Sequence, residues 1–337
     1  MQDGCCVVCG DQLATEGITY QISSNGTFAT VISYTGTSDT VRIADTYQGV
    51  PVTTIGTNAF ASCEILRYVE FPTTVTEIGK SAFSGCVNLQ AVAIPAGITL
   101  IGEKAFLGCT ALSSFSVSLE NTVYAAVDGH LYTRDFTTLV QYALGNSATT
   151  FTTPIGITAI APYAFAGATR LTSVTVSGSV AHIGNRAFEA CSALTEIILP
   201  AGLTKIENST FAKCSALTSI TLPSGVKVIE SWAFSDCTAL TSIQLPTACE
   251  EIGEYAFFNC KSLTSVTLNA GLITIRANAF SWCVALQEIV IPASVTSVGA
   301  GAFTNCVVLT VKCEAAAQPD TWDENWNSGN CPVVWEN

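Results

Sequence analysis

Cysteine is the residue type in this chain with the widest capacity for chemistry. The 337 residues include 15 cysteines but only two histidines and one methionine. Thiols can form disulfides, bind metal ions or act as nucleophiles, and their positions help to decide which. Nine of the cysteines recur at one place in a repeated pattern, three residues after a phenylalanine. They are Cys63, Cys86, Cys109, Cys191, Cys214, Cys237, Cys260, Cys283 and Cys306.

These nine positions are those of core residues. A tenth copy of the pattern has Ala168 in the same place, and a position that accepts Cys or Ala is small and apolar. Free Cys behaves as a small hydrophobe, so we predict a column of reduced, buried thiols. Cross-linking between neighbouring turns stays open, since stacking would bring the sulfurs close together. Cys249 takes a position that other copies fill with Val226 or Leu272, so it is also predicted to be core.

The other five cysteines lie outside the repeats. Cys313 and Cys331 could form a disulfide across the C-terminal segment in an oxidising compartment, or could remain free. Cys5, Cys6 and Cys9 lack a second pair at the spacing of zinc ligands, so no metal site is predicted there.

Residues for acid–base catalysis are few. An enzyme needs several polar groups that converge in one pocket. We predict that His130 and His182 are solvated surface residues, and that Glu250 and Glu251 lie in a solvated turn. The sequence has no phosphate-binding glycine loop, nucleophile elbow or zinc-binding helix motif. It therefore predicts no catalytic residue, no cofactor and no enzymatic activity.

Phenylalanine recurs every 23 residues, and this period indicates which elements position the cysteines and the other residues described above. The series consists of Phe60, Phe83, Phe106, Phe165, Phe188, Phe211, Phe234, Phe257, Phe280 and Phe303. The single longer interval, between Phe106 and Phe165, holds one period and an insertion of 36 residues. A fixed period of this length is typical of a solenoid, in which each repeat buries its apolar face against its neighbours.

One repeat is enough to predict the elements. Residues 217–222 alternate apolar and hydroxyl side chains, which is typical of a short strand with one buried face. Pro223 ends that strand. Ala233, Phe234 and Cys237 have helical spacing and predict a short helical turn. We therefore expect an α/β solenoid, a curved right-handed coil of ten 23-residue repeats, with a parallel β-sheet on the concave face and short helical turns on the convex face.

The repeat resembles that of a known family. The pattern V-x-x-I-G-x-x-A-F-x-x-C-x-x-L-x-x-I-x-L-P, seen from Val75 to Pro95, is similar to the BspA-type (Treponema-like) leucine-rich repeat. It departs from commoner leucine-rich repeats, which place Asn or Cys just after the strand, where Gly225 stands here. The resemblance covers roughly residues 18–335 and is much more specific for fold than for function.

The pattern also predicts the domain limits. We expect a flexible leader over residues 1–17, an N-terminal β-hairpin cap over 18–50, and a repeat array over 51–312. A hairpin is inserted in the array at 118–153, and a tryptophan-rich cap covers 313–337.

Local signals support the caps and the insertion. The Asn-Gly pair at Asn25 and the Asp-Gly pair at Asp128 are turn signals between β-prone runs. We expect Trp322, Trp326 and Trp335 to cover the last turn of the array rather than to bind a ligand.

Charge and hydropathy exclude some partners. The net charge is −13 and only 12% of residues are charged, so nucleic acid is not an expected partner. No apolar run is long enough to span a bilayer. Met1 is consistent with a start codon added where a signal peptide was removed, or with a protein that has no leader.

Two surfaces are candidate binding sites. The first is the outward side of the concave strands, with Arg67, Tyr68, Glu70, Thr172, Thr175, Glu196, Thr218, Thr221, Thr241, Gln244, Thr264, Thr267 and Glu288. The second is a convex aromatic patch of Trp232, Tyr255, Phe258 and Trp282. Each has an ordinary alternative, because Thr suits an exposed strand and an aromatic patch also suits contact between copies.

The resemblance implies an extracellular or cell-surface protein of the adhesin type. It implies host cell-surface or matrix partners such as fibronectin and fibrinogen, and a glycan ligand also remains open. The alternative is a structural surface-layer protein, a spacer that associates with itself through the aromatic patch.

Overall fold

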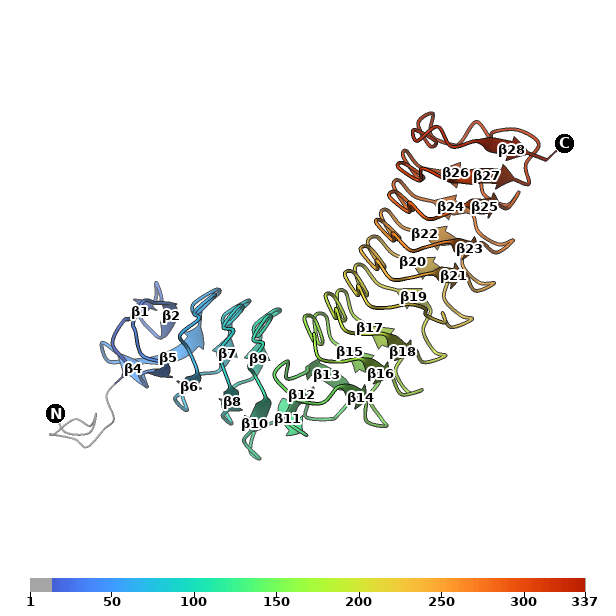
Figure 1. Cartoon of the computed structure of the whole chain (residues 1–337). Coiled ribbons are helices and arrows are strands. Elements are labelled where there is room, and N and C mark those ends of the chain that lie inside the picture. The colour runs from blue at the N-terminus through green and yellow to red at the C-terminus, as the bar shows by residue number, and fades with distance from the viewer. Residues whose placement is uncertain (1–13, 337) are drawn as a thin grey trace. The chain divides into compact units, whose positions relative to one another are not determined.

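The computed structural model describes residues 14–336. The chain forms two compact units, Met1–Ser147 and Ala148–Asn337. Each unit is a stack of short coils whose strands lie side by side (Figure 1). Residues 14–336 contain strands and turns but no helix, and so none that could cross a bilayer.

Within the described residues, thirteen strands belong to the first unit and fifteen to the second. Those of the first unit are β1 (Ile18–Ile22), β2 (Ala29–Tyr34), β3 (Thr40–Arg42), β4 (Thr46–Tyr47), β5 (Val50–Ile55), β6 (Tyr68–Glu70), β7 (Glu77–Ile78), β8 (Ala91–Ile94), β9 (Leu100–Ile101), β10 (Ser114–Val117), β11 (Tyr124–Val127), β12 (His130–Thr133) and β13 (Thr138–Gln141). Those of the second unit are β14 (Thr150–Thr152), β15 (Ala159–Ile160), β16 (Ser173–Thr175), β17 (His182–Ile183), β18 (Glu196–Ile198), β19 (Lys205–Ile206), β20 (Val228–Ile229), β21 (Ser242–Gln244), β22 (Glu251–Ile252), β23 (Ser265–Thr267), β24 (Thr274–Ile275), β25 (Glu288–Ile291), β26 (Ser297–Val298), β27 (Thr310–Cys313) and β28 (Val333–Trp335).

In the first unit, coil stacking begins before the first repeat phenylalanine. β1 and β2 form the antiparallel hairpin expected around Asn25, and β2 then pairs in parallel with β5, followed by β7 and β9. A second parallel sheet has the order β10-β8-β6-β3. β11 and β12 form the inserted hairpin, and β13 adds to it antiparallel. The expectation of ten repeats is not confirmed, because the described residues form about 13 coils.

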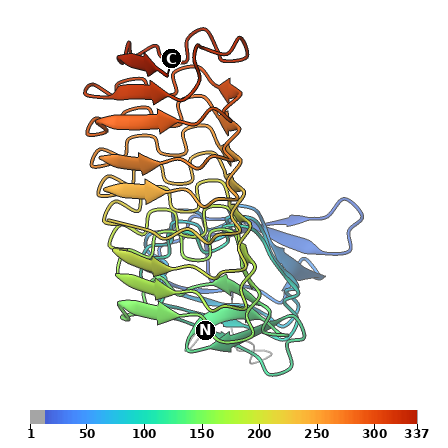
Figure 2. The same cartoon turned by 90° about the vertical axis from the view of Figure 1, so that its right-hand side faces the viewer.

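The second unit contains two rows of parallel strands. The longer strands pair in the orders β14-β16-β18 and β21-β23-β25-β27-β28, and the short strands in the orders β15-β17 and β19-β20-β22-β24-β26. Partners such as Ser242 and Ser265 are 23 residues apart, so one repeat equals one coil. Figure 2 shows the longer strands stacked one above another. We call the outward side of the sheets that contain β3, β6, β8 and β10, and β14, β16, β18, β21, β23, β25 and β27, the strand face.

The repeat phenylalanines form the core of each unit. All ten are at most 1% exposed. In the second unit, neighbouring rings from Phe165 to Phe303 stack with centroids 4.7–5.7 Å apart and interplanar angles of 3–16°. Such near-parallel stacking requires each coil to repeat the path of the last. A column of stacked phenylalanine rings is present in each unit.

The repeat cysteines form a second column beside the rings. In eight of them the Sγ–H donates to the carbonyl of the phenylalanine 26 residues earlier, at 3.0–3.2 Å. All described cysteines are free, and within the column only Cys63 is partly exposed. Burial raises the pKa of the Cys86 thiol to about 12. The thiols therefore act as buried apolar groups that also satisfy a backbone carbonyl.

The expected helical turns are wrong. The segment around each phenylalanine is a series of tight turns, illustrated here by residues 230–237. Trp232 and Asp236 have φ of 61° and 59°, in the left-handed region that a right-handed helix does not use. The N–H groups of Ala233, Ser235 and Cys237 each donate to the carbonyl three residues earlier.

The alternate N–H groups explain why no helix forms. Trp232, Phe234 and Asp236 donate to the carbonyls of Glu254, Ala256 and Phe258 in the next coil, at 2.7–2.9 Å. A helix would direct all of these N–H groups back along its own axis. Hydrogen bonding between coils therefore replaces hydrogen bonding within a helix.

Two of the C-terminal tryptophans cover the last ring of the column. Trp322 and Trp326 are 5% and 4% exposed. The ring of Trp326 meets Phe303 edge to face at 6.1 Å, and Trp322 Nε1 donates to the Val295 carbonyl. Both indole N–H groups have protein partners, as a structural cover requires.

We predict that Phe234→Ala lowers the free energy of unfolding by about 3–5 kcal/mol, because it leaves a cavity between two stacked rings. Urea denaturation followed by circular dichroism measures the loss. The matched control is Ser265→Ala on the exposed strand face, which should change stability by less than about 0.5 kcal/mol. A loss below about 1 kcal/mol for Phe234→Ala would contradict the buried column.

Candidate functional site

The structure corrects the sequence analysis on His130, which was expected to be solvated. Its side chain is 3% exposed, on β12 of the inserted hairpin. The Ala143 N–H donates to His130 Nδ1 at 3.1 Å, and the Tyr142 ring stacks on the imidazole at 4.3 Å. Burial lowers the pKa of His130 to about 4, although the Asp128 carboxylate opposes the shift. His130 is a neutral core residue.

The other candidate acid–base groups belong to the second unit. His182 is exposed, with Nδ1 at 3.9 Å from Glu207 Oε1. Glu250 is exposed, and Glu251 Oε1 accepts from Arg276 Nε at 2.8 Å. Within residues 14–336, no group of three or more His, Cys, Asp or Glu side chains could hold a metal ion.

The two cysteines of the C-terminal segment do not form a disulfide with each other in the structure. Cys313 and Cys331 are both free thiols in the structure. Cys331 Sγ lies 3.8 Å from the Phe303 carbonyl and 3.7 Å from the Cys306 carbonyl, so it continues the cysteine column. Cys5, Cys6 and Cys9 lie outside the described residues, and the absence of a metal site there stays a prediction.

The strand face displays the predicted candidate residues. All thirteen have exposed side chains except Thr175, which is half-buried. They alternate with core residues such as Val174, Ile197 and Ile243, which are at most 5% exposed. The period of two in the sequence therefore separates the inward and outward side chains correctly.

In several coils, the hydroxyl group of the first strand-face threonine already donates a hydrogen bond within the protein. The hydroxyls of Thr172, Thr241 and Thr264 each donate to a carbonyl of the preceding coil, at 3.1 Å. A hydroxyl that donates inward keeps lone pairs for an outside donor. This part of the strand face therefore offers acceptors more than donors.

The distinctive residues near the N-terminal end are paired with their neighbours. Arg67 Nε lies 3.8 Å from Asp39 Oδ2, and Glu70 forms an ion pair with Arg42. Tyr68 Oη donates to Gln90 Oε1 at 2.5 Å. In the second unit, Glu288 pairs with Lys312 at 2.7 Å. Exposed pairs of this kind contribute little energy and remain accessible to a partner.

The aromatic patch is smaller than the sequence suggested. Trp232 and Tyr255 stack at 4.1 Å, and Phe258 meets both rings at 5.7–5.8 Å. Trp232 is 37% exposed. Trp282 is 46% exposed, but no ring contact joins it to the other three. Both tryptophans have positive φ, a conformation that is uncommon for bulky residues.

The strand face has a break that no sequence pattern indicated. Residues 219–222 occupy the place of a strand between β18 and β21, yet they pair with neither. The adjoining coils are paired at the short strands, where β20 joins β19 and β22. The separation is therefore local to the strand face.

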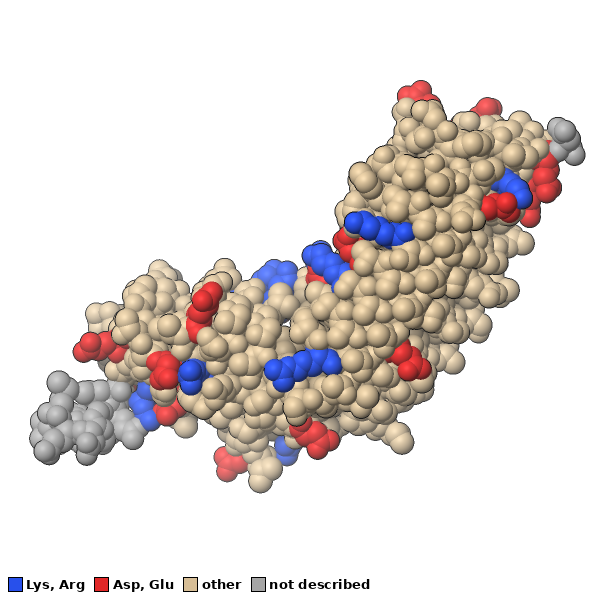
Figure 3. Space-filling model, in the orientation of Figure 1, with Lys and Arg blue, Asp and Glu red and all other residues tan. Residues whose placement is uncertain are grey.

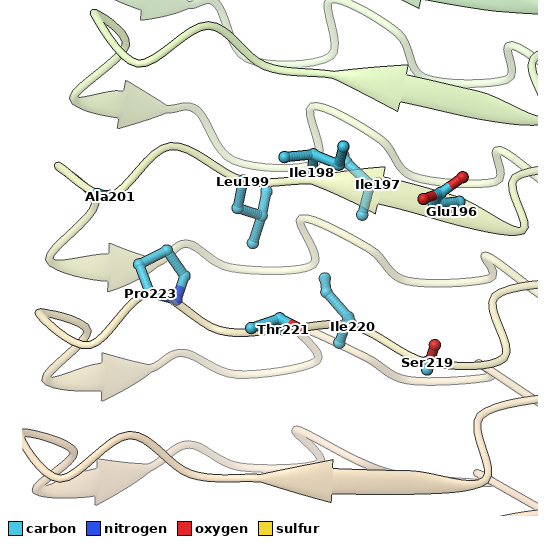
Figure 4. Close-up of a pocket in the computed structure, with 9 residues that line it drawn as sticks. All are labelled: Glu196, Ile197, Ile198, Leu199, Ala201, Ser219, Ile220, Thr221 and Pro223. Carbon is cyan, nitrogen blue, oxygen red and sulfur yellow. The ribbon is translucent and has the colours of Figure 1, made fainter.

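Two cavities flank this unpaired segment. One, of about 380 Å³, lies between β18 and residues 219–223, and Figure 4 shows its lining. The other, of about 490 Å³, lies between residues 219–224 and the coil of β21. Both share Ser219, Ile220 and Thr221 as a wall. Glu196 is the one charged residue that lines either cavity.

Charge is sparse over the molecule in general. On the face shown in Figure 3, Lys, Arg, Asp and Glu side chains form small separate groups on an otherwise uncharged surface, and only 12% of the residues in the sequence are charged. Such a surface suits a partner that is recognised by shape and neutral hydrogen bonds, rather than by a strong field.

Comparisons with known proteins identify the repeats. The chain matches the family model described as "BspA type Leucine rich repeat region", in six copies, over residues 41–127, 137–240 and 204–316. No curated protein matches the chain.

Several solved structures share the fold. A leucine-rich repeat protein from Eubacterium ventriosum is 24% identical, over 94% of this chain and 98% of that one, with a TM-score of 0.67. The pneumococcal vaccine antigen PcpA is 19% identical, over 94% and 82%, with a TM-score of 0.60. A leucine rich cell surface protein from Faecalibacterium prausnitzii is 24% identical, over 76% and 94%, with a TM-score of 0.51.

We predict that the His130 ring titrates with a midpoint near pH 4 in the folded protein, because burial disfavours its charged form. NMR spectroscopy of the two histidine rings measures this midpoint, with the exposed His182 followed in the same spectra. In the unfolded chain the ring takes up its proton near pH 6.5. Its contribution of about 3 kcal/mol is therefore complete above pH 6.5 and is lost as the pH falls toward 4. A folded-state midpoint above pH 6 would contradict the burial.

Proposed function

We propose that this chain, which belongs to the BspA-type leucine-rich repeat family, is a non-catalytic binding scaffold. It acts outside the cell, secreted or held at the cell surface, and recognises a host protein or glycan through its strand face. Matrix proteins of the fibronectin and fibrinogen class are the protein partners that the family resemblance implies.

One observation carries this proposal. The repeats place apolar groups inward and exposed hydroxyl, amide and carboxylate groups outward on stacked strands. In the described residues, the histidine most protected from solvent is a neutral core residue rather than a general base. The polar groups are thus spread over a surface, which suits binding, rather than gathered at a reacting atom.

The burial of the cysteine column supports a location outside the cell. An oxidising medium attacks exposed thiolates, whereas buried thiols with a raised pKa stay inert. The column thiols from Cys86 to Cys306 are buried, and burial also raises the pKa of Cys249 to about 11. One similar structure, from Faecalibacterium prausnitzii, is described as a cell surface protein.

The aromatic cluster favours a second candidate function. Trp232, Tyr255 and Phe258 form a compact apolar group on the turn segments, away from the strand positions. Apolar side chains that remain exposed are often covered by another molecule. In a structural surface-layer or spacer protein, that molecule is a second copy of the chain.

We predict that the double variant Thr218→Lys/Thr241→Lys weakens ligand binding by about tenfold or more, because it places two charges in the middle of a neutral face. Surface plasmon resonance against fibronectin, fibrinogen and a glycan array measures the change. The control is Asn278→Lys, which adds a charge in a turn-segment position that holds Lys104 in another repeat. Binding that survives in the double variant would exclude the strand face.

For the alternative function, we predict that Trp232→Ala shifts any self-association to higher protein concentration in analytical ultracentrifugation. The control is Trp282→Ala, since Trp282 is also exposed but has no ring contact with the cluster. A wild-type chain that stays monomeric at all concentrations would remove the spacer hypothesis.

A further inference from the structure

We propose that the unpaired segment of the strand face, residues 218–222, is the ligand-contacting part of that face and takes a neutral oligosaccharide. We call this segment the open coil. The inference rests on the proposed function, because it names the place on the strand face and the chemical class of the ligand.

Most of the backbone of the open coil has no hydrogen-bond partner in the protein. The N–H and C=O groups of Ser219, Ile220, Thr221 and Leu222 form no hydrogen bond within the protein. Thr218 retains one link, since its carbonyl accepts from the N–H and hydroxyl of Thr241. An unpaired backbone group that loses water costs about 1–3 kcal/mol, so such groups need water or a ligand as partner.

Closely similar sequences form paired strands in other coils. Ser173-Val174-Thr175 and Ser265-Val266-Thr267 have nearly the same residues as Ser219-Ile220-Thr221, and both are paired strands, β16 and β23. The core side chain of the open coil is also different, because Ile220 is half-buried whereas Val174 is fully buried. Nothing in the local sequence explains the separation.

Space for a ligand lies on both sides of the open coil. The two cavities lie on opposite sides of Ser219, Ile220 and Thr221, so one ligand could contact both. Their walls combine hydroxyl and amide groups, such as Ser242 and Gln244, with apolar groups, such as Leu199 and Leu245.

This combination selects the ligand class. A sugar hydroxyl both donates and accepts, which matches alternating N–H and C=O groups, and the C–H faces of a sugar ring match the apolar walls. An anionic ligand is disfavoured, since no Lys or Arg lines either cavity and Glu196 would repel it. β18 and β21 each end a sheet at the open coil, so an extended peptide that adds a strand is the rival occupant, and the test below distinguishes it from a sugar.

The test uses two variants in matched positions. Ser219→Phe fills the shared wall of the cavities, and Ser265→Phe makes the same change in the paired strand β23, where the side chain is equally exposed. The probes are an array of neutral hexasaccharides of glucose, mannose, galactose and xylose, followed by calorimetry on those that bind. We expect Ser219→Phe to weaken binding at least about tenfold and Ser265→Phe less than about twofold. Thr221→Tyr, with Thr267→Tyr as its control, replaces the pair if Ser219→Phe does not fold.

Hydrogen exchange provides a second readout on the wild-type protein. Amides of residues 219–222 should exchange faster than those of residues 265–267, because they lack hydrogen-bond partners. The bound hexasaccharide should slow exchange at residues 219–222 and leave residues 265–267 unchanged.

The outcomes separate this inference from the proposed function. If no neutral hexasaccharide binds, the ligand class is wrong, while protein binding that is lost in Thr218→Lys/Thr241→Lys would leave the scaffold function intact. Equal binding by Ser219→Phe and Ser265→Phe would place the sugar elsewhere. A peptide that binds wild type but not Ser219→Phe, with no sugar binding, would also overturn the proposal.

Discussion

Backbone hydrogen bonding between coils is the interaction on which the rest of the structure depends. It requires neighbouring coils to follow the same path, and the stacked phenylalanines and buried thiols provide that register. The near-parallel rings leave little room for one coil to slide over the next. The thiols add a link, since eight of the nine in the column donate to the carbonyl of a phenylalanine in a neighbouring coil. The 23-residue period is therefore a requirement of the core, and the outward residues are free to vary.

The sequence predicted the parts of the fold that repeat. The 23-residue period predicted a solenoid. The alternation of apolar and polar residues correctly predicted that Thr218 and Thr241 are exposed and that Leu217 and Leu240 are buried. The turn segments were misread because Ala-Phe-x-x-Cys has helical spacing. A better signal was the Asn and Gly content two residues before and after the phenylalanine, as in Asn58 and Gly85, since these residues adopt positive φ readily.

The candidate site was predictable only in part, because its special features are departures from the repeat. His130 is buried against Tyr142 and Ala143, and no period relates these residues. The open coil has an ordinary sequence, so periodicity could not distinguish Ser219 from Ser265. Such features depend on the packing of particular coils, which the spacing of residue types does not specify.

A repeat architecture also permits a local break of this kind. Each coil contacts only its neighbours, so the free energy lost when one strand separates stays within three coils. The short strands and the turn segments of those coils remain paired, as β20 with β22 and Phe234 with Ala256 show. The columns of Phe211, Phe234 and Phe257 continue without interruption beneath the open coil. A regular solenoid has the same backbone pairing along its whole strand face, so its side chains alone must define a binding site. An unpaired segment adds backbone donors and acceptors at one position, and a stack of nearly identical coils thereby acquires a unique site without a change in its core.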